Sequence, residues 1–230
     1  MLQIQKKLTP YNYSKMTSRT IQYIVIHYVG KVSTAKNNAD YFHDNDLRGT
    51  DREASAHYFV DEKSIWQSVE DKDRAWHCGG GLQGSNGHTH YGKCTNYNSI
   101  GVEMCVKKDK KGVWYIEPET INNTVDLVKM LIAKHNIPVS QVIRHYDVTG
   151  KTCPEPMVRD EKQWFDFLSR LSAPQKLETG NDIIWELMNG KHKIEITEVD
   201  RAVKALDKAK KNNEYCSLYW ILYKLVNGNK

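Results

Sequence analysis

The chain has 230 residues, of which 40% are hydrophobic and 27% are charged, a balance typical of folded globular proteins and not of disordered ones. This length allows one sizeable core and a small appendage. The formal net charge is +5 and no dense block of Lys or Arg stands out, so the composition favours no nucleic-acid partner.

The N-terminal residues and the hydropathy of the chain speak against membrane insertion. Residues 1–7 lack the apolar run of a secretory signal peptide. No segment approaches the roughly 18 consecutive apolar residues of a membrane-spanning helix. We therefore expect a chain that is synthesised in the cytoplasm without a signal peptide. Action outside the membrane would then need a separate release route.

Hydrophobic patterning predicts strands interspersed with helices. Residues 21–27 form a nearly continuous, β-branched run that is typical of a strand buried on both faces, and Gly30 is expected to end it. Further strands are predicted over residues 54–60, 64–69, 99–106 and 142–143. Helices are predicted over residues 35–42, 118–135 and 163–171, the first capped by Ser33 or Thr34.

Residues 78–98 are predicted to form a long loop, because they include six glycines and few aliphatic residues. Long loops within a compact domain are often functional. Strands mixed with helices indicate an α/β or α+β core, which we place in residues 1–172.

The composition changes at residues 172–175, which we interpret as a linker. Residues 176–230 are predicted to form a small helical C-terminal region, with helices over residues 181–188, from Thr197 onward, and over residues 214–226. Three short helices make a marginal independent domain. This region could brace the core or join two copies in a homodimer.

His145 and Cys153 stand eight residues apart, with Gly150 between them and Pro154 after them. We expect a loop that folds back and brings the imidazole and the thiolate to one metal ion. His27, at the end of a buried strand, could supply a third ligand. Two His and one Cys leave one position open, as in catalytic zinc sites.

Taken alone, this pattern leaves other interpretations open. A lone His at a strand end is more often a hydrogen-bonded residue of the core or the surface than a ligand. A buried Cys usually behaves as a small hydrophobic residue.

Five sequence blocks occur in an order that is specific as a set. They are YIVIHY at residues 23–28, SAHYFVD at 55–61, AWH at 75–77, NSIGVE at 98–103 and RHYDVTGKTCP at 144–154. Together they resemble the N-acetylmuramoyl-L-alanine amidases of the type-2 amidase family. That family includes phage endolysins, bacterial autolysins and the peptidoglycan recognition proteins. The resemblance covers roughly residues 20 to 160.

The resemblance implies a central mixed β-sheet flanked by helices, with a cleft for Zn²⁺ on one side. It implies His27, His145 and Cys153 as the zinc ligands. It also implies Glu103 as the acid–base residue and Lys151 as the group that stabilises the oxyanion.

One position departs from part of the family. Other branches carry a catalytic tyrosine just before the residue equivalent to His57, and this chain has Ala56 there. The departure makes Glu103 the better candidate for acid–base work.

The implied reaction is hydrolysis of the amide bond between N-acetylmuramic acid and L-alanine in peptidoglycan. Trp76 and His77 are expected to form a cleft wall that contacts the glycan or the stem peptide, although a buried structural Trp is an alternative. His57 is a further candidate for substrate contact, with packing in the core as its alternative.

The remaining histidines and cysteines give no sign of a second site. His88 and His90 are expected to be solvated and not to form a second metal site. Cys78, Cys94 and Cys105 lack a Cys-x-x-Cys spacing and are expected to be structural or free.

Two rival functions stay open at this point. One is a peptidoglycan-binding module without catalysis, and the other is a cytoplasmic amidase that recycles muropeptides. The C-terminal region could also bind wall polymers.

Overall fold

The computed structural model describes residues 1–172, and Met1–Leu171 form one compact unit. The predictions for residues 176–230, including the three helices, wall binding and the homodimer, lie outside the described residues. Within the described part, no helix combines the length and the apolar character that crossing a bilayer requires.

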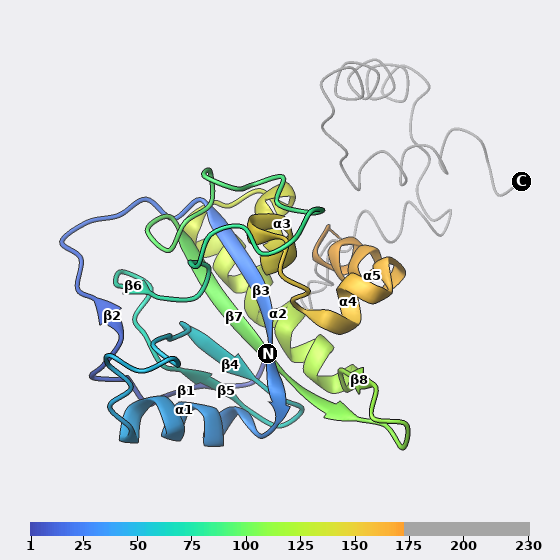
Figure 1. Cartoon of the computed structure of the whole chain (residues 1–230), viewed down its shortest axis with the longest axis horizontal. Coiled ribbons are helices and arrows are strands. Elements are labelled where there is room, and N and C mark those ends of the chain that lie inside the picture. Colours follow the sequence, from blue (N-terminus) through green and yellow to red (C-terminus); the bar gives the residue numbers. More distant parts are fainter. Residues whose placement is uncertain (173–230) are drawn as a thin grey trace, which may run out of the picture. The chain divides into compact units, whose positions relative to one another are not determined.

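A seven-stranded mixed sheet forms the centre of this unit (Figure 1). Six strands follow the order β1-β5-β4-β7-β3-β9, and β8 pairs with β7 outside this path. The strands are β1 (Ile4–Lys6), β3 (Tyr23–Val32), β4 (Tyr58–Val60), β5 (Ile65–Gln67), β7 (Ser99–Lys108), β8 (Trp114–Tyr115) and β9 (Val142–Arg144). The pairs β4–β5 and β7–β8 are antiparallel and the others are parallel. The expected central mixed sheet is confirmed.

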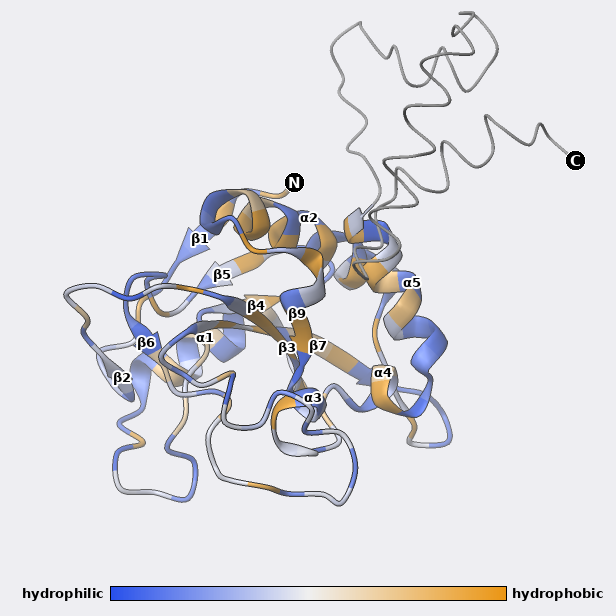
Figure 2. Ribbon diagram, turned by 90° about the horizontal axis from the view of Figure 1, so that it is seen from above, coloured by the Kyte–Doolittle hydropathy of each residue, from blue (hydrophilic) through white to orange (hydrophobic). Residues whose placement is uncertain are grey.

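Alternate residues of the central strands point to two different layers. Ile24 and Ile26 of β3, with Val102 of β7, belong to the large core cluster that includes residues of α2 (Pro118–His135). Val25 of β3 packs on the other face, with Val148 of α3 (His145–Thr149). Because side chains alternate along a strand, His27 and Glu103 belong to the α3 face. Figures 1 and 2 show α2 on one side of the sheet and α3 on the other.

Hydrophobic residues concentrate in the central strands and on the sheet-facing side of α2 (Figure 2). In the predicted stripe of α2, Val125 and Val128 are buried, while Ile121 and Ile132 pack against the core from partly buried positions. Asn136 ends the helix in the left-handed conformation, with φ of 52°.

The helices α1 (Ala35–Asp44) and α5 (Glu161–Ser172) confirm two further predictions. The Thr34 hydroxyl accepts a hydrogen bond from the Asn37 N–H at 3.1 Å, which identifies Thr34 as the N-cap. Several short elements were not predicted: the strands β1 and β8, the strands β2 (Tyr13–Ser14) and β6 (Arg74–Ala75), which pair with each other, the 3-10 helix η1 (Val139–Gln141), and α4 (Glu155–Arg159).

Two local predictions were wrong. Gly30 does not end the strand: β3 continues to Val32, with an irregularity in its pairing to β7 after Tyr28. Gly30 adopts a φ of +41° in this irregular segment, which glycine allows without a break in the strand. The segment from His145 to Cys153 is not all loop, because its first five residues form α3. The Asp147 carboxylate accepts the Arg144 N–H at 2.8 Å and so caps this short helix.

Candidate metal centre and active-site cleft

Three elements bring the predicted metal ligands together. Strand β9 pairs in parallel with β3, with Arg144 opposite Ile26, so that His145 and His27 directly follow paired positions. After α3 the chain turns at Gly150, whose φ is +81°, and the Tyr146 N–H donates to the Cys153 carbonyl at 2.9 Å. This backbone hydrogen bond returns Cys153 to the start of α3.

One donor atom from each of His27, His145 and Cys153 lies within 4.8 Å of the other two. The Cys153 Sγ is 3.7 Å from the His27 Nδ1. All three residues are buried, and neither ring nitrogen of His145 has a hydrogen-bond partner in the described structure. A buried imidazole whose nitrogens have no hydrogen-bond partner lowers the stability of the folded state unless another group binds those nitrogens. Two imidazoles and one thiol around a common point are therefore suited to hold a metal ion.

The electrostatic environment keeps both imidazoles neutral, as metal ligation requires. Burial, reinforced by the nearby Lys151 and His77, lowers the pKa of His145 to about 3. Burial likewise holds the pKa of His27 well below its usual value, with further contributions from His145 and His77. Burial raises the pKa of the Cys153 thiol, so the protein alone does not stabilise its thiolate. A bound cation would supply that stabilisation.

Glu103 stands next to this group on the neighbouring strand. It is the register partner of His27 across β3 and β7. Its Oε2 is buried without a hydrogen-bond partner, although the residue as a whole is only half-buried. Burial raises the pKa of Glu103 to about 7, against the opposing effects of His77 and Lys151. A carboxyl group with this pKa can accept and return a proton near neutral pH.

A cavity of about 490 Å³ opens over the metal ligands and Glu103. Lys151, which is exposed, contributes a positive charge to its lining. Trp76 and His77, the residues expected to form a cleft wall, also line it. Trp76 is half-buried and its indole N–H donates to the Ser14 hydroxyl at 3.1 Å.

His77 lies deeper than a wall residue would. Its Nδ1 is 3.0 Å from the His27 Nε2, and its Nε2 is 3.2 Å from the Ser99 hydroxyl. The sequence did not predict this contact with a metal-ligand candidate.

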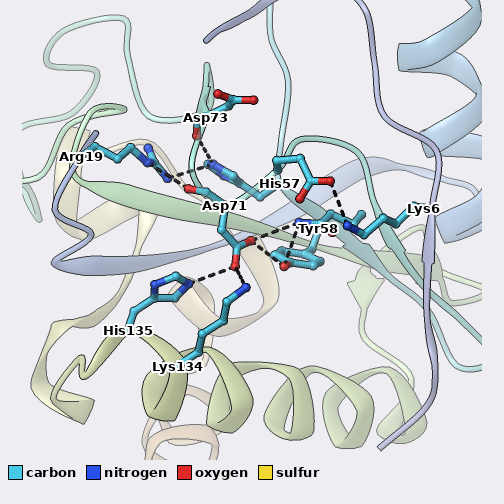
Figure 3. A network of polar contacts seen from close by, with 10 residues as sticks. Lys6, Arg19, His57, Tyr58, Asp71, Asp73, Lys134 and His135 are labelled. Carbon is cyan, nitrogen blue, oxygen red and sulfur yellow. Dashed lines mark hydrogen bonds and ion pairs between the residues drawn. The ribbon is translucent and has the colours of Figure 1, made fainter. Parts of the chain in front are cut away.

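His57, in contrast, is not brought to the cavity. It is fully buried, and its Nδ1 accepts the Gly101 N–H at 3.0 Å while its Nε2 lies 3.1 Å from the Asp73 carbonyl oxygen. Figure 3 shows it within a polar network that also includes Arg19 and Asp71. Both ring nitrogens are thus occupied, and the structure favours the packing alternative over substrate contact.

The cavity includes residues that the sequence analysis did not single out. Arg52 adds a second cation to the lining, and its guanidinium lies 3.5 Å from the Tyr41 hydroxyl. Tyr28 also lines the cavity and donates its hydroxyl proton to Glu155 at 3.1 Å. Tyr28 is the last residue of the 23–28 block and directly follows His27, which could have indicated it, but no sequence signal distinguished Arg52 or Tyr41.

The other histidines and cysteines that the sequence analysis discussed as possible second sites lie outside the metal-ligand group. Among residues 1–172, the candidate metal-binding group consists of His27, His145 and Cys153, and neither His88 nor His90 joins such a group. Cys78, Cys94 and Cys105 are buried free thiols.

The residues of this site lie in a segment that is similar in sequence to known amidases. A family model described as N-acetylmuramoyl-L-alanine amidase matches residues 17–156. The amidase CwlL of Bacillus licheniformis is 31% identical over 169 residues, which are 73% of this chain and 45% of the relative. The amidase CwlH of Bacillus subtilis strain 168 is 26% identical over 209 residues, which are 86% of this chain and 76% of the relative.

The fold is also shared with solved structures. The PlyG catalytic domain is 30% identical with a TM-score of 0.59, and the match covers 78% of this chain and 99% of that domain. PlyL is 29% identical with a TM-score of 0.57, over 74% of this chain and 97% of that chain. This chain spans less than half the length of CwlL and of a second, probable amidase from Bacillus licheniformis. Because the family match extends from before β3 to beyond Cys153 and includes all three metal-ligand candidates, the chain belongs to the Amidase_2 family of N-acetylmuramoyl-L-alanine amidases.

Proposed function

We propose that this protein is a zinc-dependent amidase that hydrolyses the bond between N-acetylmuramic acid and L-alanine in peptidoglycan. The observation that carries the proposal is the placement of His27, His145 and Cys153 beside Glu103 at one cavity. Membership of the amidase family supports the same reaction.

The donor set favours zinc over other common metals. Two imidazole nitrogens and one thiolate suit Zn²⁺, whereas Mg²⁺ and Ca²⁺ prefer oxygen ligands. Three protein ligands leave one position open, as in catalytic zinc sites. Bound zinc would supply a Lewis acid that polarises the amide carbonyl and makes water more acidic.

Glu103 is placed to move protons in this reaction. With a pKa raised to about 7 by burial, its carboxylate can take a proton from the attacking water near neutral pH. The resulting carboxyl group can then donate that proton to the departing alanine nitrogen. The proton transfer frees the L-alanine amino terminus.

Lys151 contributes charge stabilisation. Its ammonium group lines the cavity that holds Glu103 and the ligand candidates. A cation at this place stabilises the negative charge that develops on the carbonyl oxygen during attack. Aromatic residues of the lining, such as Trp76 and Tyr41, offer flat surfaces on which a sugar or peptide can pack.

We further propose that the substrate is wall peptidoglycan and that the enzyme reaches it from the cytoplasm by a separate release route, as an endolysin or autolysin would. One structural relative, 27% identical with a TM-score of 0.55, is described as a mutant endolysin from Bacillus subtilis. The presence of all three ligand candidates and Glu103 favours catalysis over a purely binding role.

The test is the release of new L-alanine amino termini from purified peptidoglycan, with soluble muropeptides assayed in parallel. The wild-type chain is compared with Cys153→Ser and Glu103→Ala, and with Glu119→Gln as a control at an exposed carboxylate. We expect activity that a chelator removes, zinc restores and both site variants lack.

Each other outcome has a defined meaning. Binding of peptidoglycan without new amino termini would make the protein a recognition module. Cleavage of soluble muropeptides but not of intact peptidoglycan would indicate a recycling amidase.

A further inference from the structure

A chain of hydrogen bonds leads from the metal-ligand candidate His27 through His77 and Ser99 to a backbone carbonyl. The three contacts are 3.0 Å between His27 Nε2 and His77 Nδ1, 3.2 Å between His77 Nε2 and Ser99 Oγ, and 2.6 Å between Ser99 Oγ and the Thr95 oxygen. These distances show which atoms are paired, and the number of protons on each group determines which atom of each pair is the donor.

The Thr95 carbonyl oxygen at the end of the chain of contacts can only accept a hydrogen bond. The Ser99 hydroxyl has one proton, and the short 2.6 Å contact places it on the Thr95 oxygen. Ser99 must then accept from His77, so when the His77 ring carries a single proton, that proton sits on Nε2. Its Nδ1 is therefore an acceptor, and the His27 Nε2 must donate to it. This leaves the lone pair of His27 on Nδ1, the atom that lies 3.7 Å from Cys153 Sγ.

The neighbours of Ser99 are consistent with this direction. Cys78 Sγ lies 3.7 Å from Ser99 Oγ, but its thiol proton has a nearer acceptor in the Asn96 side-chain oxygen at 3.3 Å. Cys78 therefore need not donate to Ser99, and the Thr95 oxygen at 2.6 Å is a closer acceptor for the Ser99 proton than Cys78 Sγ.

Packing holds the His77 ring in this orientation. A Cβ at Gly101 would lie 2.6 Å from His77 Cγ, so the ring rests directly on the backbone of β7. The His57 ring lies steeply inclined to it, with ring centroids 5.7 Å apart and an interplanar angle of 75°. The His77 N–H donates to the Asn96 side-chain oxygen at 2.9 Å, which anchors its backbone as well. Small, polar and aromatic groups thus confine the ring on several sides.

We propose that His77 is a positioning residue for the metal site. It holds His27 in the tautomer whose Nδ1 is free to bind the metal. Ser99 and Thr95 fix the tautomer of His77 itself. The inference rests on the proposed metal-dependent function but concerns the ligand, not the hydrolysis. Partners that orient metal-binding histidines raise metal affinity by about 10- to 100-fold. This role is more specific than that of a cleft wall.

The first measurement uses the wild-type chain. Two-dimensional NMR of the histidine ring nitrogens, on metal-free protein at mildly alkaline pH, reports which nitrogen carries the proton. We expect the Nε2–H tautomer for both His27 and His77. A proton on Nδ1 of His27 would overturn the proposal, and no variant is needed for this result.

The second measurement compares metal affinity in two variants by competition with a chelator. His77→Phe keeps a flat ring but removes the acceptor, and should lower zinc affinity about 10- to 100-fold. His77→Asn can place an amide oxygen near the former Nδ1, and should recover most of that loss. Equal zinc affinity of the wild type and His77→Phe would contradict the proposal.

If His77→Phe does not fold, the variant Ser99→Ala still tests the proposal, through its zinc affinity and through the visible spectrum of bound cobalt(II). Ser99→Ala removes the hydroxyl that fixes the His77 tautomer while keeping the His77 ring. We expect a smaller loss of affinity and an altered cobalt(II) visible spectrum, and an unchanged affinity and spectrum would count against the relay. None of these readouts uses peptidoglycan, so inactivity toward peptidoglycan would overturn the proposed function while leaving this inference supported.

Discussion

His27 and Glu103 lie directly opposite each other on the parallel strands β3 and β7. Paired positions on neighbouring strands place their side chains on the same face of the sheet. The spacing between a metal-ligand candidate and the carboxylate is therefore set by the hydrogen-bonded sheet and not by a flexible loop. Sites built on rigid elements hold their geometry better than sites on loops.

Glu103→Gln should separate metal binding from catalysis. The amide is close in size to the carboxyl group but cannot accept a proton from water at neutral pH. We expect the rate of amide hydrolysis to fall about 10²- to 10⁴-fold, the usual contribution of a general acid–base group. Zinc content, measured by atomic emission, should stay near that of the wild type. A variant that loses zinc together with activity would show that Glu103 supports the metal instead.

Removal of the metal should destabilise the fold. A metal that binds only the folded state stabilises it by about 4 kcal/mol at 1,000 times its dissociation constant. We expect the melting temperature to fall on chelation and to recover with zinc. In Cys153→Ser this dependence should be strongly reduced, whereas Cys105→Ala, at a buried thiol outside the metal group, should retain it. A melting temperature that zinc does not change in the wild type would contradict the metal site.

Lys151→Ala should lower catalysis without loss of metal. Removing one group that stabilises an oxyanion costs about 10²- to 10³-fold in rate. We expect a loss of that order in the turnover number, with zinc affinity unchanged or slightly raised because a cation leaves the neighbourhood. Lys162→Ala, at an exposed lysine outside the cavity lining, is the control. Full activity of Lys151→Ala would assign Lys151 to the solvated surface.

Gly101→Ala should displace the His77 ring and so disturb the metal site. The added Cβ would meet His77 Cγ at 2.6 Å, too close for the ring to remain in place. We expect weaker zinc binding and a loss of about 1–3 kcal/mol in the free energy of unfolding, as for overpacked cores. Gly79→Ala is the matched control, because its Cβ would have its nearest contact at 3.6 Å. Urea titration and chelator competition would measure the two effects, and equal behaviour of both variants would contradict the close packing.

Asp71 should make stability depend on pH. Burial by itself raises the pKa of Asp71, but hydrogen bonds from Lys134, Tyr58 and His135 outweigh it and hold this pKa below the usual 3.8 (Figure 3). A carboxyl group whose pKa is lowered on folding stabilises the folded state above its usual pKa. That stabilisation is lost as the pH falls through the pKa of the folded state.

The variant Asp71→Asn tests this dependence. At neutral pH it should cost about 1.5–3 kcal/mol of unfolding free energy, the range for hydrogen bonds to charged groups. The difference from the wild type should shrink below about pH 3.8. Asp166→Asn, at an exposed ion pair, should change stability by less than about 1 kcal/mol. A difference that is independent of pH would exclude the charge of Asp71 as its cause.

The long periodic elements could be predicted from the sequence, because local patterning determines them. The apolar stripe of residues 118–135 and the nearly continuous apolar run of residues 21–27 correspond to α2 and to the first half of β3. The shorter strands such as β1 and β8 could not be predicted in this way. Each has two or three residues without a readable period and pairs with a neighbouring strand, whereas the equally short β4, β5 and β9 lie within apolar runs that could be recognised.

The sequence by itself determined the identity of the site candidates: a His at the end of a buried strand, the His145-to-Cys153 segment, and the carboxylate of Glu103. Only the tertiary structure decided how they meet, because parallel pairing of β3 with β7 and β9 joins residues that are far apart in the chain. Two of the histidine candidates illustrate the limit of sequence. Both His57 and His77 are candidates for substrate contact in the sequence. Long-range contacts bury His57 among backbone partners and place His77 against His27, because packing that no local pattern encodes decides the partners of each ring.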